Sequence, residues 1–136
     1  MLRPQIHTIY CDDIIHDVNG KQSYIGAYST ELIIPVFPAI LPKLMIVLRV
    51  PYSEDDPIRA INISVLKDSD VLQVIDLNEE KLPRPKGISS TQLLIFEIVF
   101  SPLQLDAPCI IKVNVKLDEE EYEGQSLQIL KAPTKQ

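Results

Sequence analysis

The chain has 136 residues and a formal net charge of −6, with 46% hydrophobic and 24% charged residues. This length and composition are typical of one globular domain and exclude a largely disordered chain. The acidic balance, without a cluster of Lys and Arg, argues against a nucleic-acid ligand.

The N-terminus and the cysteines indicate the compartment. The first residues form no leader-like apolar segment, and no apolar run approaches the roughly 20 residues needed to cross a bilayer. Two cysteines, Cys11 and Cys109, are too few for a disulfide scaffold and are typical of reduced, buried thiols. A single bridge between them is the alternative. These features predict a cytoplasmic protein without a membrane segment.

Nine segments are predicted as strands, because they alternate apolar and polar residues or form short runs rich in β-branched and aromatic side chains. In chain order they are residues 6–11, 23–28, 31–34, 44–50, 59–66, 71–77, 93–100, 110–117 and 125–130. Asn19-Gly20-Lys21 predicts a hairpin turn, and Gly26 indicates a bulge or a close approach of two backbones. One helical turn is predicted at residues 101–105, where Ser-Pro is able to start it.

Eight or nine short strands with regular turns predict an antiparallel β-sandwich, immunoglobulin-like, with a small barrel as the alternative. The sandwich is predicted to be a single domain over residues 1–131, followed by a flexible tail over residues 132–136. Antibody-type hallmarks are missing, since the chain has no tryptophan and its two cysteines are far apart in sequence.

The N-terminal segment contains the residue types of a metal site: His7, Cys11, Asp12, Asp13 and His16. On a regular strand, however, His7 and Cys11 lie too far apart to share one ion. A bulge would be needed to gather Cys11, Asp13 and His16. A Cys11–His16 pair also lacks the glycine-rich or helix N-terminal setting that lowers a thiol pKa. We therefore expect no metal, no cofactor and no enzymatic activity, with carboxylates that cap backbone N–H groups.

Three tyrosines predict an interaction patch. Tyr24 and Tyr28 share one face of a regular strand, and Tyr10 lies on a neighbouring strand. Tyrosine side chains are common anchors at protein interfaces. The alternative is that all three complete the core and extend their hydroxyls to the surface.

A motif of defined spacing is concentrated near the N-terminus. Its residues are Cys11-Asp12-Asp13-Ile14, Asp17, Gly20-Lys21, Ser23, Ile25-Gly26, Tyr28, Pro35, Pro38 and Leu41-Pro42-Lys43, with Gly124-x-Ser126-Leu127-x-Ile129 near the end. In these residues the chain resembles a family of small, uncharacterised bacterial and phage proteins, classed as a domain of unknown function. The resemblance implies a compact β-sandwich in a bacterial or viral cytoplasmic setting, and it implies no activity.

The first hypothesis is a non-enzymatic β-sandwich that binds another protein, such as a phage or prophage factor acting on a host protein. The second is a self-assembling or virion-associated structural protein, which includes a homo-oligomer. The third is a metal- or thiol-dependent enzyme centred on Cys11, Asp13 and His16. The role of the motif is open between a binding surface and a structural hinge. The motif residues concerned are Cys11, Asp12, Asp13, Gly20, Lys21 and Gly26.

Overall fold

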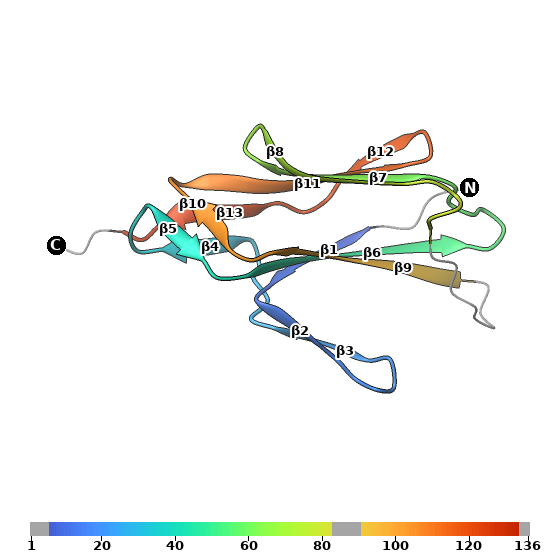
Figure 1. The fold of residues 1–136 in the computed structure, drawn as a ribbon, viewed down its shortest axis with the longest axis horizontal. Coiled ribbons are helices and arrows are strands. Elements are labelled where there is room, and N and C mark those ends of the chain that lie inside the picture. The colour runs from blue at the N-terminus through green and yellow to red at the C-terminus, as the bar shows by residue number, and fades with distance from the viewer. Residues whose placement is uncertain (1–5, 83–90, 134–136) are drawn as a thin grey trace.

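Two β-sheets face each other in the computed structural model, which describes residues 6–82 and 91–133 (Figure 1). The first sheet has three strands in the order β1-β6-β9, and the second has the order β4-β13-β11-β7-β8, with β12 also paired to β11. The strands of the first sheet are β1 (His7–Cys11), β6 (Leu44–Ser53) and β9 (Thr91–Phe100). Those of the second are β4 (Glu31–Ile34), β7 (Ile61–Lys67), β8 (Asp70–Leu77), β11 (Cys109–Leu117), β12 (Glu120–Glu123) and β13 (Leu127–Lys131).

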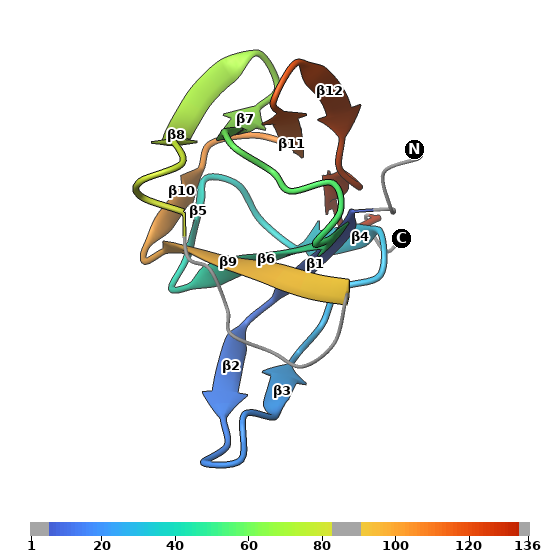
Figure 2. The ribbon, with the colours of Figure 1, turned by 90° about the vertical axis from the view of Figure 1, so that its right-hand side faces the viewer.

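Two short strand pairs lie outside these sheets. β5 (Ala39–Leu41) pairs with β10 (Leu103–Leu105), and β2 (Asp13–His16) pairs with β3 (Gln22–Ile25). The second pair, residues 13–25, is called the projecting hairpin below. It extends from the three-stranded sheet on the side opposite the other sheet (Figures 1 and 2).

The core lies between the two sheets. Buried apolar residues that face this core alternate along the strands with more exposed residues, as predicted from the sequence. In β11, every second residue from Cys109 to Leu117 is buried, while Lys112, Asn114 and Lys116 are exposed. β6 contributes Leu44, Ile46, Leu48, Val50 and Tyr52 to the same core. Burying one such aliphatic side chain contributes roughly 1.5–3 kcal/mol. The continuous cluster therefore dominates the stability of the sandwich.

The predicted all-β class is confirmed, and the sheets form two layers without closing into the alternative barrel. The described residues form thirteen strands where eight or nine were predicted. One pairing is not antiparallel as predicted, since β13 and β4 run parallel. The immunoglobulin-like assignment and the single-domain boundary at residue 131 stay predictions. Backbone pairing continues to Ala132, whose N–H donates to the Ile34 carbonyl at 2.9 Å, and residues 134–136 of the predicted tail lie outside the described residues.

Several local predictions are corrected by the structure. The helical turn predicted at residues 101–105 is wrong, because Leu103 and Leu105 are buried on either side of exposed Gln104 and form β10. The strand predicted over residues 23–28 ends at Ile25, where Gly26 takes a φ of 64° and leaves the extended conformation. Tyr28 rejoins the fold through a single bridge to Tyr10.

Candidate functional site

The tip of the projecting hairpin has its turn at Asn19-Gly20 as predicted, but of these two residues only Gly20 has a positive φ. Gly20 takes a φ of 83°, a conformation that glycine adopts without steric cost. Its N–H donates to the Asp17 carbonyl at 3.1 Å, and the Asp17 carboxylate accepts the Asn19 N–H at 3.0 Å. The Asp17 N–H in turn donates to the Lys21 carbonyl at 2.8 Å, which closes the turn.

The root of the hairpin depends on Asp12, Gly26 and Tyr28. The Asp12 N–H donates to the Ile25 carbonyl at 2.9 Å, and the Tyr28 hydroxyl donates to the Asp12 carboxylate at 2.6 Å. A Cβ at Gly26 would lie 2.2 Å from Oδ2 of Asp12, so a larger residue there would displace the Asp12 carboxylate. Burial, followed by the hydrogen bond to Asp12, raises the pKa of Tyr28 to about 12. Gly26 was predicted to mark a bulge or a close approach of two backbones, whereas the atoms closest to it belong to the Asp12 side chain.

The Asp13 side chain holds the start of β2 in place through two hydrogen bonds. Its Oδ1 accepts the Ile14 N–H and the Lys43 ammonium, each at 2.8 Å. The hydrogen bond from Lys43, and then that from Ile14, lowers the pKa of Asp13. Of the two carboxylates predicted to cap backbone N–H groups, Asp13 does so, whereas the Asp12 carboxylate accepts the Tyr28 hydroxyl. The two carboxylates at the root, Asp12 and Asp13, act as structural ties between the hairpin and the sheet.

The hairpin also has a small apolar cluster of its own. Cys11, Ile14, Met45 and Val47, called the hairpin cluster below, are buried between the hairpin and the outer side of the three-stranded sheet. Ile9 and Tyr24 pack against them. Met45 and Val47 alternate with core residues along β6, so this strand is buried on both sides where the hairpin covers it.

Polar contacts hold the hairpin to β9. Nε2 of His16 lies 2.9 Å from Oε1 of Glu97, and the Gln22 side-chain amide donates to the same oxygen at 3.4 Å. His16 and Gln22 are register partners near the tip, and Glu97 lies on the outer side of its sheet. Both ends of the hairpin are therefore anchored to the sandwich.

The far side of the hairpin exposes three aliphatic side chains. Ile15 is 54% exposed and Ile25 is 45% exposed, and Val18 at the turn is 100% exposed. The partner of Ile15 in the register is Ser23, two residues from Ile25, so the two isoleucines are diagonal neighbours on one face. Two adjacent exposed isoleucines, with a fully exposed valine at the tip, give the projecting hairpin an apolar character suited to a contact site.

The predicted three-tyrosine patch does not form. Tyr10 points into the sandwich, is 2% exposed and donates its hydroxyl to the Gln125 carbonyl at 2.6 Å. Tyr24 packs on the hairpin cluster and donates to the Gln22 side chain at 2.8 Å, whereas Tyr28 packs against the main core. Tyr10 and Tyr24 lie on opposite sides of the three-stranded sheet, so no single partner surface reaches all three.

The structure does not bring Cys11, Asp13 and His16 together. Asp13 and His16 alternate to opposite faces of β2, and each has another partner. Burial, followed by the nearby Asp12 carboxylate, raises the pKa of the Cys11 thiol. Burial also raises the pKa of Cys109, which lies in the main core. Both thiols are free and buried, as predicted, and among the described residues no group of three His, Cys, Asp or Glu side chains is placed to hold a metal ion.

The fold and this site define an all-β sandwich with a projecting, anchored hairpin. The model of a family of unknown function, DUF6941, matches residues 7–130, so the chain belongs to this family. The predicted resemblance is thereby confirmed at the level of a family of unknown function. No curated protein and no solved structure matches the chain significantly. The part of the chain that the structure describes has no helix long and apolar enough to cross a bilayer.

The exposed aliphatic residues of the hairpin were not predicted from the sequence. Residues 13–16 read Asp-Ile-Ile-His, a stretch too short to show which isoleucine is buried. One signal was available, since Val18 stands directly before Asn19-Gly20 and a β-branched apolar residue at a tight turn has no core to enter.

Proposed function

We propose that the protein is a non-enzymatic binding module that contacts a partner protein through the far side of the projecting hairpin. The observation that carries the proposal is the joint exposure of Ile15, Val18 and Ile25 on an element anchored at its root and near its tip. The partner presents an apolar surface that covers these three side chains. Following the resemblance, the setting is a bacterial or phage protein that acts on a host protein in the cytoplasm.

The shape of the hairpin supports this proposal. Its near side is already used by the hairpin cluster, so the fold itself leaves the far side for an external contact. An element tied at its root and near its tip loses less conformational freedom on binding than an unanchored loop, and this favours affinity from a small contact area. Lys21 and Asp17 flank the tip with opposite charges and provide a polar rim of the kind found around apolar interface centres.

Site-specific crosslinking tests the proposal directly. A photo-crosslinking residue replaces Val18 in one protein and Val36 in a control, since Val36 is also an exposed valine, at 67%. We expect one bacterial protein to be crosslinked from position 18 and not from position 36. The captured protein, once purified, should lose binding to the double variant Ile15→Ser/Val18→Ser and retain binding to Val36→Ser/Ile40→Ser.

Two outcomes contradict the proposal. A crosslink from position 18 to a second copy of this chain, with a dimer mass in light scattering, would favour the self-assembly hypothesis. Equal loss of binding in both double variants would show that surface apolarity, and not the hairpin, drives capture. Circular dichroism of both variants serves as the check that the sandwich remains folded.

A further inference from the structure

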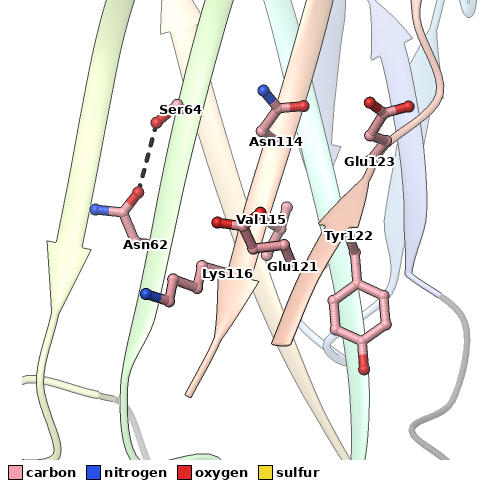
Figure 3. A pocket seen from close by; sticks show the side chains of 8 residues that line it. All are labelled: Asn62, Ser64, Asn114, Val115, Lys116, Glu121, Tyr122 and Glu123. Carbon is pink, nitrogen blue, oxygen red and sulfur yellow. Dashed lines mark hydrogen bonds between the residues drawn. The ribbon is translucent and has the colours of Figure 1, made fainter. Parts of the chain in front are cut away.

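The outer side of the second sheet carries a polar groove far from the projecting hairpin. Residues of β7 and β11 form its floor, and β12, which pairs with β11, forms one wall. Figures 1 and 2 show these strands on the side of the molecule opposite the hairpin. The hollow has a volume of about 490 Å³. The side chains that face it, shown in Figure 3, are those of Asn62, Ser64, Asn114, Lys116, Glu121 and Glu123.

The strand register arranges these side chains in two rows across the sheet. Lys116 is paired with Asn62 on one side and with Glu121 on the other. Asn114 is paired in the same way with Ser64 and Glu123. Each row therefore offers hydrogen-bond donors in the floor and a carboxylate acceptor on the β12 wall.

Most of these polar groups are not used within the protein. The Ser64 hydroxyl donates to the Asn62 side chain at a long 3.4 Å. Within the described ranges, Asn114, Lys116, Glu121 and Glu123 have no side-chain hydrogen bond or ion pair to another residue. Lys116 and Glu121 are direct cross-strand neighbours of opposite charge, yet their charged ends do not form an ion pair. These four exposed side chains are thus available to a ligand that replaces their water.

We infer that this groove binds a neutral, polyhydroxylated ligand, a short oligosaccharide in chemical class. A side-chain amide can both donate and accept hydrogen bonds, and a carboxylate can accept hydrogen bonds from two neighbouring hydroxyls. The two rows therefore match a chain of vicinal hydroxyl groups. The two glutamates oppose a phosphate or another acidic ligand, and Lys116 in the floor reduces the attraction that the glutamates would have for a cation. The volume lies within the range of small-molecule sites.

A protein partner does not suit this surface. The aliphatic residues of the floor, such as Ile63, Val113 and Val115, point into the core and are buried. Docking there would bury no apolar centre of the kind that protein interfaces have. Tyr122 also lines the hollow, but it is partly buried and packs against the core. Binding of a saccharide is therefore expected to be weak, with a dissociation constant of roughly 1 mM, because each hydrogen bond replaces one to water.

An NMR titration of the full-length chain tests the inference. The ligands are neutral trisaccharides of glucose, of galactose and of N-acetylglucosamine, with a lysine-rich peptide as a separate probe. We expect at least one trisaccharide to shift the backbone amides of residues 62–64, 114–116 and 121–123. The variant Asn114→Ala should weaken that binding by about fivefold, as expected for the loss of one hydrogen bond. Gln128→Ala, which changes an exposed residue of β13 on the same side of the sheet, should leave it unchanged.

The opposite results overturn the inference. They are the absence of shifts with all three trisaccharides, or shifts confined to residues outside the groove. A response to the lysine-rich peptide alone would show that the acidic wall selects cations and would equally exclude a saccharide site. Equal weakening in Asn114→Ala and Gln128→Ala would show that the response does not come from the groove. None of these results bears on the hairpin, which lies on the other side of the molecule.

Discussion

The sandwich and the projecting hairpin meet at β6, and this strand shows how differently the two are stabilised. Its inward residues join a cluster of more than twenty buried side chains from both sheets. Its outward residues, Met45 and Val47, join a cluster of four. The sandwich is therefore held mainly by apolar burial, whereas the hairpin depends on a few polar ties at its root and near its tip. A region with so few buried contacts can open locally without unfolding the rest.

Adjacent positions on β6 give the sharpest test of this difference. Ile46 is 0% exposed in the main core, and Met45 is 6% exposed in the hairpin cluster. Ile46→Ala should cost about 2–5 kcal/mol of global stability in urea unfolding. Met45→Ala should cost about 2 kcal/mol, and its main effect should be faster hydrogen exchange confined to residues 13–25. If Met45→Ala lowers global stability as much as Ile46→Ala, the hairpin is an integral part of the folding unit.

The two glycines of the hairpin sharpen the comparison within that element. Both have positive φ, so alanine at either position introduces about 1–2 kcal/mol of backbone strain. At Gly20 the new Cβ meets no atom within 4 Å, but at Gly26 it meets the Asp12 carboxylate. Gly26→Ala should therefore cost about 2–3 kcal/mol, because the Asp12–Tyr28 hydrogen bond is lost as well. Hydrogen exchange at residues 13–25 measures both variants, and equal effects would contradict the structural role of Asp12.

Two hydroxyl deletions compare the regions at the level of single hydrogen bonds. Tyr10→Phe leaves the Gln125 carbonyl without its donor inside the sandwich and should lower global stability by about 1–2 kcal/mol. Tyr28→Phe removes the more exposed bond to Asp12 and should cost less than about 1 kcal/mol, seen only in the hairpin. Urea unfolding measures the change in global stability, and hydrogen exchange measures the change confined to the hairpin. A global effect of Tyr28→Phe would mean that the root supports the sandwich.

Substitutions of Tyr24 and Tyr28 are poor probes of partner binding, because both side chains support the hairpin. Tyr24 packs on the hairpin cluster and Tyr28 holds Asp12, so replacing both by serine would disturb the hairpin itself. Loss of a partner in such a variant would not identify a contact surface. Ile15 and Val18 are the better positions because their side chains are exposed and support no described contact of the core.

The sequence was sufficient for the sandwich because alternation in β7 and β11 marks each buried side chain. It also predicted the hairpin turn, since Asn19-Gly20 has few other uses between two strand-like segments. Four strands of three or four residues were not predicted from the sequence, namely β2, β5, β10 and β12. Alternation cannot be recognised over so few residues, and β12 pairs with β11 although three of its four residues are glutamates.

The candidate site was harder to predict for a related reason. Alternation shows which residues share a face of one strand, but not what that face meets. Tyr10 and Cys11 lie next to each other, and only the pairing of β1 with β6 sends one into the main core and the other under the hairpin. The prediction that Tyr10 and Tyr24 share a patch was wrong for this reason, because the two side chains lie on opposite sides of the three-stranded sheet. Contacts across strands, such as Asp13 with Lys43, likewise follow from the fold and not from sequence spacing.

The smallest expected effect is a pH dependence confined to the hairpin root. The pKa of Asp13 is lowered in the folded protein, so its contribution is complete above the unfolded value of about 3.9 and is lost as the pH falls through the folded value. Hydrogen exchange at the Ile14 amide, which donates to Asp13, should therefore quicken in acid beyond its intrinsic change. Asp13→Asn should remove this dependence, and Lys43→Gln should move it to higher pH. Since Asp13 is 49% exposed and Lys43 is 39% exposed, salt should reduce the effect. An unchanged Asp13 pKa in Lys43→Gln would show that Lys43 is not the cause, and the backbone N–H of Ile14 would then be the dominant tie at this end of the hairpin.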